Sequence, residues 1–175
     1  EQPMVDSETK LAAYGAAFDV APGINGYSTL IPNNRAFGLT RAIVVPMAGH
    51  SAWAGQAALM TLTTPAKVEP KVASVAYVGL QGAQVAGGSR AAALQVLRNG
   101  LLEALDFAPE LLSRSRRERL GYGISRYDLE ALAGAALGNQ PVIVHADRAS
   151  DIAQLLRVAE QQGIRLVIAG ATEAW

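Results

Sequence analysis

The 175-residue sequence contains no cysteine. This absence excludes thiol catalysis, thiolate zinc sites and disulfides, although it does not identify a cellular compartment. No apolar run approaches the roughly 18 residues that a membrane-spanning helix needs. An excess of one charge is also lacking, because 15 Lys and Arg residues balance 15 Asp and Glu residues. Without a basic excess, the sequence does not predict a nucleic-acid partner.

Apolar residues, in contrast, are abundant. They make up 50% of the chain, which supports a sizeable core and excludes a disordered protein. The length is that of one ordinary domain. However, the chain begins at Glu1 without an initiator Met or a signal-peptide pattern, and it stops at Trp175 just after a predicted strand. We therefore expect residues 1–175 to be one segment of a longer protein.

Short β-rich runs alternate with longer helical patterns along the chain. The predicted strands are Ala16–Val20, Ala42–Val45, Val72–Val78, Val142–His145 and Arg165–Ile168. Four of them are almost continuously apolar, as is typical of strands buried on both faces of a parallel sheet. The repeated strand–helix–strand order predicts an α/β fold built of right-handed parallel βαβ units. The pattern does not distinguish an open sheet from a closed barrel.

Apolar stripes at helical spacing predict the helices between these strands. The stripes are Leu94, Leu97, Leu101 and Leu105, then Leu129, Leu132, Ala133 and Leu137, and finally Ile152, Leu155, Leu156 and Ala159. Ser125 and Asp128 fit a capping box, and Ser150 is placed to cap the helix that follows it. Gly138 and Gly163 stand where left-handed helix caps belong.

Four arginines crowd into the irregular region Ala108–Ile124, namely Arg114, Arg116, Arg117 and Arg119. An anionic partner is one interpretation of this cluster. A charge run is more often a solvated helix face, and we favour that interpretation.

The two histidines, His50 and His145, are candidate site residues. His145 ends a predicted strand, and the carboxyl ends of parallel strands form the functional face of α/β folds. There it could hold a metal through one ring nitrogen while the other nitrogen bonds a neighbouring acceptor. A hydrogen-bonded histidine without any ligand fits the position equally well.

His50 lies in the segment Pro46–Gln56, directly after a predicted strand. Glycines and other small residues there allow the backbone to approach a ligand closely. His50, Trp53 and Gln56 could supply stacking and hydrogen bonds. A βα loop that packs over the mouth of a barrel would have the same composition, and for His50 itself we favour that explanation.

Charged and glycine-rich residues beside predicted helix starts have two explanations. Arg148 could bind a substrate carboxylate and Asp147 could orient a histidine or a water, but Asp147 and Asp151 also favour a helix N-terminus. Gly87–Arg90 could bind an anion, although a glycine turn with Ser89 as helix cap explains it better. No nucleophile–base pair and no HxH or HExxH motif occurs, so this chain cannot assemble a histidine-rich metal site by itself.

Several segments resemble the amidohydrolase superfamily, and its imidazolonepropionase-like, often exported branch in particular. In chain order they are Ile31–Pro46, Gly55–Leu59, Gly87–Leu94, Pro141–Ile152 and Arg165–Trp175. The resemblance implies a TIM (β/α)8 barrel with metal ligands at the C-terminal strand ends, of which this chain would hold about strands two to six. A complete barrel takes about 250 residues, so the chain would be a partial barrel.

The resemblance also implies roles for single residues. His145 matches the metal-binding histidine at the end of the fifth barrel strand. The family's His-x-His pair and its aspartate ligand and base would lie outside residues 1–175. Gly170 stands where related proteins carry a histidine near the end of the sixth strand, and Val72–Val78 is not followed by the lysine that bridges two metals. These departures imply a mononuclear site or loss of the metal.

We therefore expect a fragment of a metal-dependent hydrolase that cleaves C–N bonds of cyclic amides or related small molecules, with zinc as the ion. His145 would be a ligand, His50, Gln56 and Arg148 would contact the substrate, and the segment alone would be inactive. One alternative is a non-catalytic barrel relative that binds a small ligand or partner, and another is a complete small binding domain. The resemblance implies export to the periplasm; otherwise the protein would be cytoplasmic.

Overall fold

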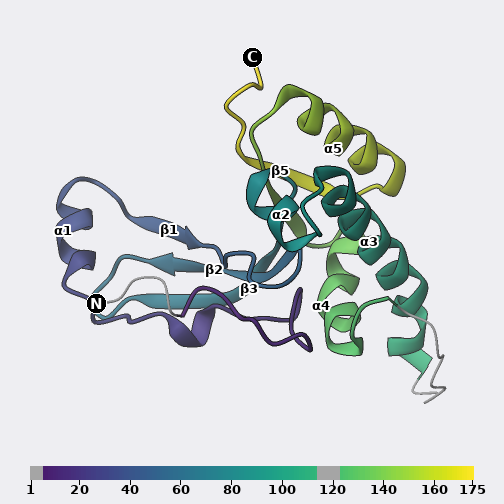
Figure 1. Ribbon diagram of the computed structural model, residues 1–175. Helices are drawn as coiled ribbons and strands as arrows, with labels where there is room; N and C mark the ends of the chain where they lie inside the picture. Colours follow the sequence, from purple (N-terminus) through teal and green to yellow (C-terminus); the bar gives the residue numbers. More distant parts are fainter. Residues whose placement is uncertain (1–5, 114–122) are drawn as a thin grey trace.

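The computed structural model describes residues 6–113 and 123–175, with only the backbone at residues 109–113. A curled five-stranded sheet in the order β1-β2-β3-β4-β5 forms its centre (Figure 1). The strands are β1 Arg41–Val44, β2 Trp53–Thr61, β3 Lys67–Tyr77, β4 Pro141–Ala146 and β5 Arg165–Gly170. The helices are η1 Ala21–Gly23, α1 Leu30–Ala36, α2 Leu80–Val85, α3 Arg90–Ser113, α4 Arg126–Ala136 and α5 Ala149–Gln162. The arginine cluster at residues 114–119 lies outside the described residues.

The direction of the strands changes at β3. β1 pairs with β2, and β2 with β3, in antiparallel register, whereas β3, β4 and β5 are parallel. β3 is 11 residues long, and it pairs with β4 only from Ser74 onward. The sheet thus has an antiparallel arm, made of β1, β2 and residues 67–73, and a parallel half-barrel made of residues 74–77, β4 and β5. The predicted α/β class and partial barrel are confirmed.

The strand prediction is wrong in the N-terminal part of the chain. Ala16–Val20 is not a strand, and Asp19 makes only a single bridge to Gln56. The segment Pro46–Gln56, expected to be a βα loop, includes the start of β2, so β1 and β2 are joined as an antiparallel hairpin without a helix between them. Gly55, with φ of 139° and no Cβ, lets the carbonyl of Phe18 approach β2 closely.

Helices α3, α4 and α5 cover one face of the parallel strands (Figure 1). Their buried residues include Leu97, Leu101, Leu129, Leu132, Ile152 and Leu155, which pack with Ala76, Val142 and Val144 of the sheet. Burial of each leucine contributes about 1.5–3 kcal/mol. The predicted apolar stripes are confirmed except at their edges, where Leu105, Leu137 and Leu156 are exposed.

A smaller apolar cluster lies on the opposite face of the sheet. It contains Val75 and Tyr77 of β3, Ile143 of β4 and Ala57 of β2. Because side chains alternate along a strand, His145 shares this face with Ile143. The candidate ligand therefore lies on the face away from the helices, at the carboxyl end of β4.

The helix ends agree in part with the predictions. Ser125 caps α4 and accepts a hydrogen bond of 3.2 Å from the backbone of Asp128, as the capping box predicts. Gly163 ends α5 with φ of 67°, and Gly138 follows α4 with φ of 72°. Ser150 is not a cap, because α5 already begins at Ala149.

Candidate functional site

His145 lies beside Tyr77, its register partner across the parallel pair of β4 and β3. The two rings are stacked, with centroids 4.3 Å apart and planes inclined by 4°. The Tyr77 hydroxyl donates a hydrogen bond of 3.1 Å to the carbonyl of Pro46. Tyr77 is therefore fixed by its strand pairing and by the hydrogen bond of its hydroxyl.

The backbone of His145 is bound firmly, but part of its side chain is not satisfied. Its carbonyl accepts hydrogen bonds from the backbone N–H groups of Val78 at 3.0 Å and Gly79 at 3.3 Å. Nε2 is buried without a hydrogen-bond partner, a condition that among the described residues it shares only with Oε1 of Gln162. An unsatisfied buried polar atom costs about 1–3 kcal/mol. A ligand at Nε2 would remove this cost.

Burial also favours the form of His145 that can bind a metal. Desolvation lowers the pKa of the imidazole, and the negative charge of Asp147 opposes this effect only in part. The ring is therefore neutral at pH 7, and a neutral imidazole nitrogen is a common metal ligand. Burial raises the pKa of Tyr77, which keeps its hydroxyl protonated as a donor to Pro46.

The position expected to carry a second histidine is filled by a neighbouring side chain. Gly170 ends β5 with φ of 85°. A Cβ atom there would lie 2.6 Å from Oδ1 of Asp147. Asp147 is itself held, because Oδ1 accepts a hydrogen bond of 2.8 Å from the Thr172 hydroxyl and its carbonyl accepts one of 2.9 Å from Glu173. A side chain at position 170 would require Asp147 to move.

No cluster of three or more His, Cys, Asp or Glu side chains that could hold a metal occurs in residues 6–113 and 123–175. Tyr77 ends β3 on the face of the sheet that carries His145. The resemblance implies a metal-bridging lysine at this strand end, and the residue there is this tyrosine. Among the described residues, His145 is thus the single candidate metal ligand at the expected metal position.

The other predicted site residues belong to elements other than β4. His50 lies in the turn before β2, partly buried, with Nδ1 3.4 Å from the carbonyl of Thr9. Arg148 occupies the capping position of α5, and its side chain is exposed. Trp53 is a core residue, whose Nε1 donates a hydrogen bond of 3.3 Å to the carbonyl of Val96.

Gln56 serves as an internal cross-link and is only 1% exposed. Its Nε2 donates to the carbonyl of Ala16 at 2.8 Å and to the Ser74 hydroxyl at 3.1 Å, while Oε1 accepts from Gln140 at 3.0 Å. Its register partner Ser74 stands at the amino end of the parallel pairing, opposite the end that carries His145. We therefore do not retain Gln56 as a substrate contact.

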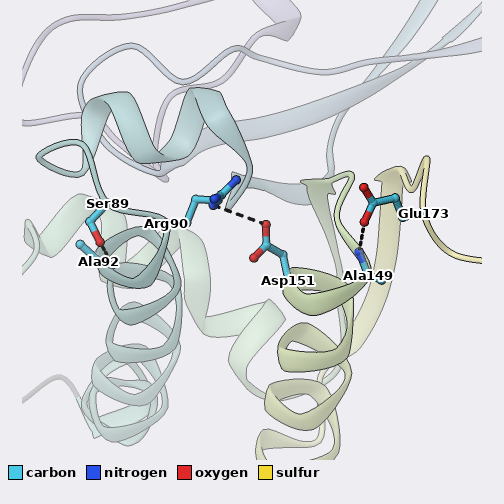
Figure 2. Close-up of polar contacts among 6 residues, drawn as sticks. All are labelled: Ser89, Arg90, Ala92, Ala149, Asp151 and Glu173. Carbon is cyan, nitrogen blue, oxygen red and sulfur yellow. Dashed lines mark hydrogen bonds and ion pairs between the residues drawn. The ribbon is translucent and has the colours of Figure 1, made fainter.

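The starts of α3 and α5 face each other beside the sheet (Figure 2). Ser89 caps α3 through a 3.3 Å hydrogen bond from the Ala92 N–H, which supports the turn-and-cap interpretation of Gly87–Arg90. Arg90 and Asp151 form an ion pair of 3.9 Å between the two helices. They line an open hollow of about 320 Å³ with Val78, Ala91, Leu94, Ser150 and Gln154. His145 does not line this hollow.

Sequence reasoning missed the residue that caps α5. Oε2 of Glu173, which follows β5, accepts a hydrogen bond of 3.0 Å from the N–H of Ala149, the first residue of α5 (Figure 2). A carboxylate is favourable at a helix N-terminus. Because the two residues are 24 positions apart, no local sequence signal announces this cap.

No protein-family model and no curated protein matches the sequence. No helix among the described residues has both the length and the apolar character needed to cross a membrane. In structure, the chain is similar to an amidohydrolase from Thermotoga maritima MSB8, with a TM-score of 0.78 and 21% identity. The match covers 97% of this chain and 46% of the other, so the chain spans about half the length of that protein. The chain therefore has the fold of part of an amidohydrolase.

Proposed function

We propose that the chain is part of a metal-dependent hydrolase that cleaves C–N bonds of cyclic amides or related small molecules. The observation that carries this proposal is the unpartnered Nε2 of His145 at the carboxyl end of β4. It lies in a fold shared with an amidohydrolase, at the sheet end where α/β barrels place their active sites. The imidazolonepropionase-like branch is proposed from the sequence segments alone.

His145 fits a metal ligand because its buried Nε2 has no hydrogen-bond partner and its ring is neutral at pH 7. When bound, a divalent ion such as Zn²⁺ lowers the pKa of water to about 7 and polarises a carbonyl group. The remaining ligands and the general base belong, in this proposal, to residues outside those described. Arg148, exposed three residues after His145, is the candidate to pair with a substrate carboxylate.

Metal analysis of the protein that contains this chain tests the proposal. We expect stoichiometric zinc in the unaltered protein and its loss in His145→Ala. His50→Ala is the matched control, because it removes the only other histidine of residues 1–175 and should leave the zinc content unchanged. Zinc retained in His145→Ala, or no divalent metal in any of the three proteins, contradicts the proposal.

A second candidate function is that of a non-catalytic barrel relative which binds a small ligand or partner without metal. The contact between Gly170 and Asp147 favours it, because no side chain fits at position 170 while Asp147 keeps its place. This alternative predicts an unaltered protein that is folded, free of metal and inactive as a hydrolase. The same metal analysis therefore separates the two.

A further inference from the structure

We propose that Tyr77 is a positioning residue for His145: its stacked ring fixes the plane of the imidazole and so the direction in which Nε2 meets a ligand. The inference rests on the proposed function, since it concerns how this chain prepares its metal ligand. Its evidence is the geometry of the two rings and of the hydroxyl that anchors one of them.

The imidazole needs such a support. Rotation about the bond between Cβ and the ring has broad energy wells, so a histidine ring is not oriented by its own torsional preference. Metal-binding histidines are usually oriented by a hydrogen bond at the nitrogen that does not bind the metal. At His145 the nitrogen left free for a metal is the buried Nε2, and the ring contact that can orient the imidazole is the phenol ring, with centroids 4.3 Å apart. With planes inclined by only 4°, rotation of the imidazole would push its edge into the Tyr77 ring.

Tyr77 is rigid enough to act as this support. The residue is only 8% exposed, and its hydroxyl is bonded to the carbonyl of Pro46 at 3.1 Å. Its backbone N–H donates a hydrogen bond of 2.9 Å to the carbonyl of Ala52, and Gly82 of α2 packs closely against its carbonyl. The ring thus has backbone, packing and hydroxyl contacts, and none of these contacts comes from His145.

The stack and the hydroxyl bond make separable contributions. Tyr77→Phe keeps the aromatic face and loses only the bond to Pro46, whereas Tyr77→Leu removes the face. Loss of a residue that orients a metal ligand typically lowers metal affinity by about 10-fold to 100-fold. We therefore expect a loss of this size in Tyr77→Leu and a change below about threefold in Tyr77→Phe, the variant in which the aromatic ring is retained.

Zinc affinity, measured by competition with a chelator, tests the inference in the protein that contains this chain. A second readout is the NMR shift of the His145 ring protons in the metal-free protein, because a stacked phenyl ring moves them upfield. They should move downfield in Tyr77→Leu and stay in place in Tyr77→Phe. Tyr14→Leu is the control, because Tyr14 lies next to Tyr127 instead. Tyr77→Met, which preserves more of the volume, replaces the leucine variant if the latter does not fold.

Unchanged affinity and unchanged ring-proton shifts in a folded Tyr77→Leu or Tyr77→Met protein would overturn the inference while leaving the proposed function intact. Absence of zinc from the unaltered protein would instead overturn the proposed function, and the inference with it. The two failures are therefore distinguishable in one series of proteins.

Discussion

Gly170 and Asp147 occupy adjoining strand ends so closely that only one of them can carry a side chain in the present arrangement. A Cβ atom on Gly170 would lie 2.6 Å from Oδ1 of Asp147. The backbone adds a second restriction, because φ at Gly170 is 85°. The glycine is thus required by its neighbour as well as by its own conformation.

We predict that Gly170→Ala lowers the free energy of unfolding by about 2–4 kcal/mol, the sum of left-handed strain and a forced shift of Asp147. Gly163→Ala is the matched control, because Gly163 has φ of 67° but no atom within 4 Å of its Cβ position. It should cost only about 1–2 kcal/mol. Urea unfolding measures both. Equal losses would mean that Asp147 moves aside without cost.

The pH dependence of stability should report on His145. Burial holds its pKa in the folded state below the ordinary value of 6.5, so the unfolded state binds the proton more readily. The contribution of His145 to the free energy of unfolding is then fully present above pH 6.5, and it is lost as the pH falls from there toward the folded-state pKa. Urea unfolding of the metal-free protein between pH 8 and pH 5 measures the effect. His145→Asn should flatten this slope, whereas an unchanged slope in that variant would assign it to other groups.

Asp128 should be among the most sensitive polar residues of the described chain. One carboxylate oxygen accepts backbone hydrogen bonds of 3.0 Å from Gly15 and 2.7 Å from Ala17, and the other accepts 2.9 Å from the Ser125 hydroxyl. Asp128→Ala leaves the backbone N–H groups of Gly15 and Ala17 without this acceptor, while the Ser125 hydroxyl can still donate to the carbonyl of Ala13, and it should cost about 2–4 kcal/mol by thermal or urea unfolding. Glu130→Ala, which breaks only the exposed pair with Arg126, should cost under about 0.5 kcal/mol. Similar losses in both would contradict the assignment.

Replacement of Gln56 should affect stability without affecting the candidate site. Gln56→Ala removes the hydrogen-bond partner of the buried Ser74 hydroxyl and one of the partners of Gln140. We expect the free energy of unfolding to fall by about 1–3 kcal/mol. Gln95→Ala on the exposed side of α3 should be nearly neutral. Unfolding and zinc content are measured on the same samples. A loss of zinc in folded Gln56→Ala would restore this residue to the site.

The parallel half-barrel could be predicted because its signals are local. β4 and β5 are short apolar runs, and the helix between them has a regular apolar stripe that ends at Gly163. Each of these features lies within a few residues of the element it specifies. β4 is largely buried, as its apolar run predicts, whereas β5 has the same kind of run but is only partly buried or exposed along its length.

The antiparallel arm could not be predicted in the same way. Trp53–Thr61 contains three alanines and a glycine, lacks a run of β-branched residues and is buried without alternation over its first six positions. Such a strand is defined by its partners, and the close approach of Phe18 to Gly55 becomes visible only once the chain is folded. Composition alone made its first residues, which belong to the segment Pro46–Gln56, look like part of a loop.

The candidate site divides along the same lines. His145 was found because a histidine at the end of an apolar strand is visible in the sequence. The stack with Tyr77 was not predicted, because it depends on a strand register that brings together two residues 68 positions apart. The contact of Asp147 with Gly170 similarly needs the two strand ends side by side. Pairing register, which tertiary packing decides, is the information that was missing.

Because β3 belongs to both parts of the sheet, its two halves should differ in how easily their backbone hydrogen bonds open. Residues 74–77 lie between β2 and β4, whereas residues 67–69 pair with β2 alone. Amide protons in the arm should therefore exchange through a partial opening that leaves the parallel half closed. Pro46, in the connection between β1 and β2, holds the Tyr77 hydroxyl. Fraying of the arm that displaces Pro46 would thus also break the hydroxyl bond of the aromatic ring that stacks on His145.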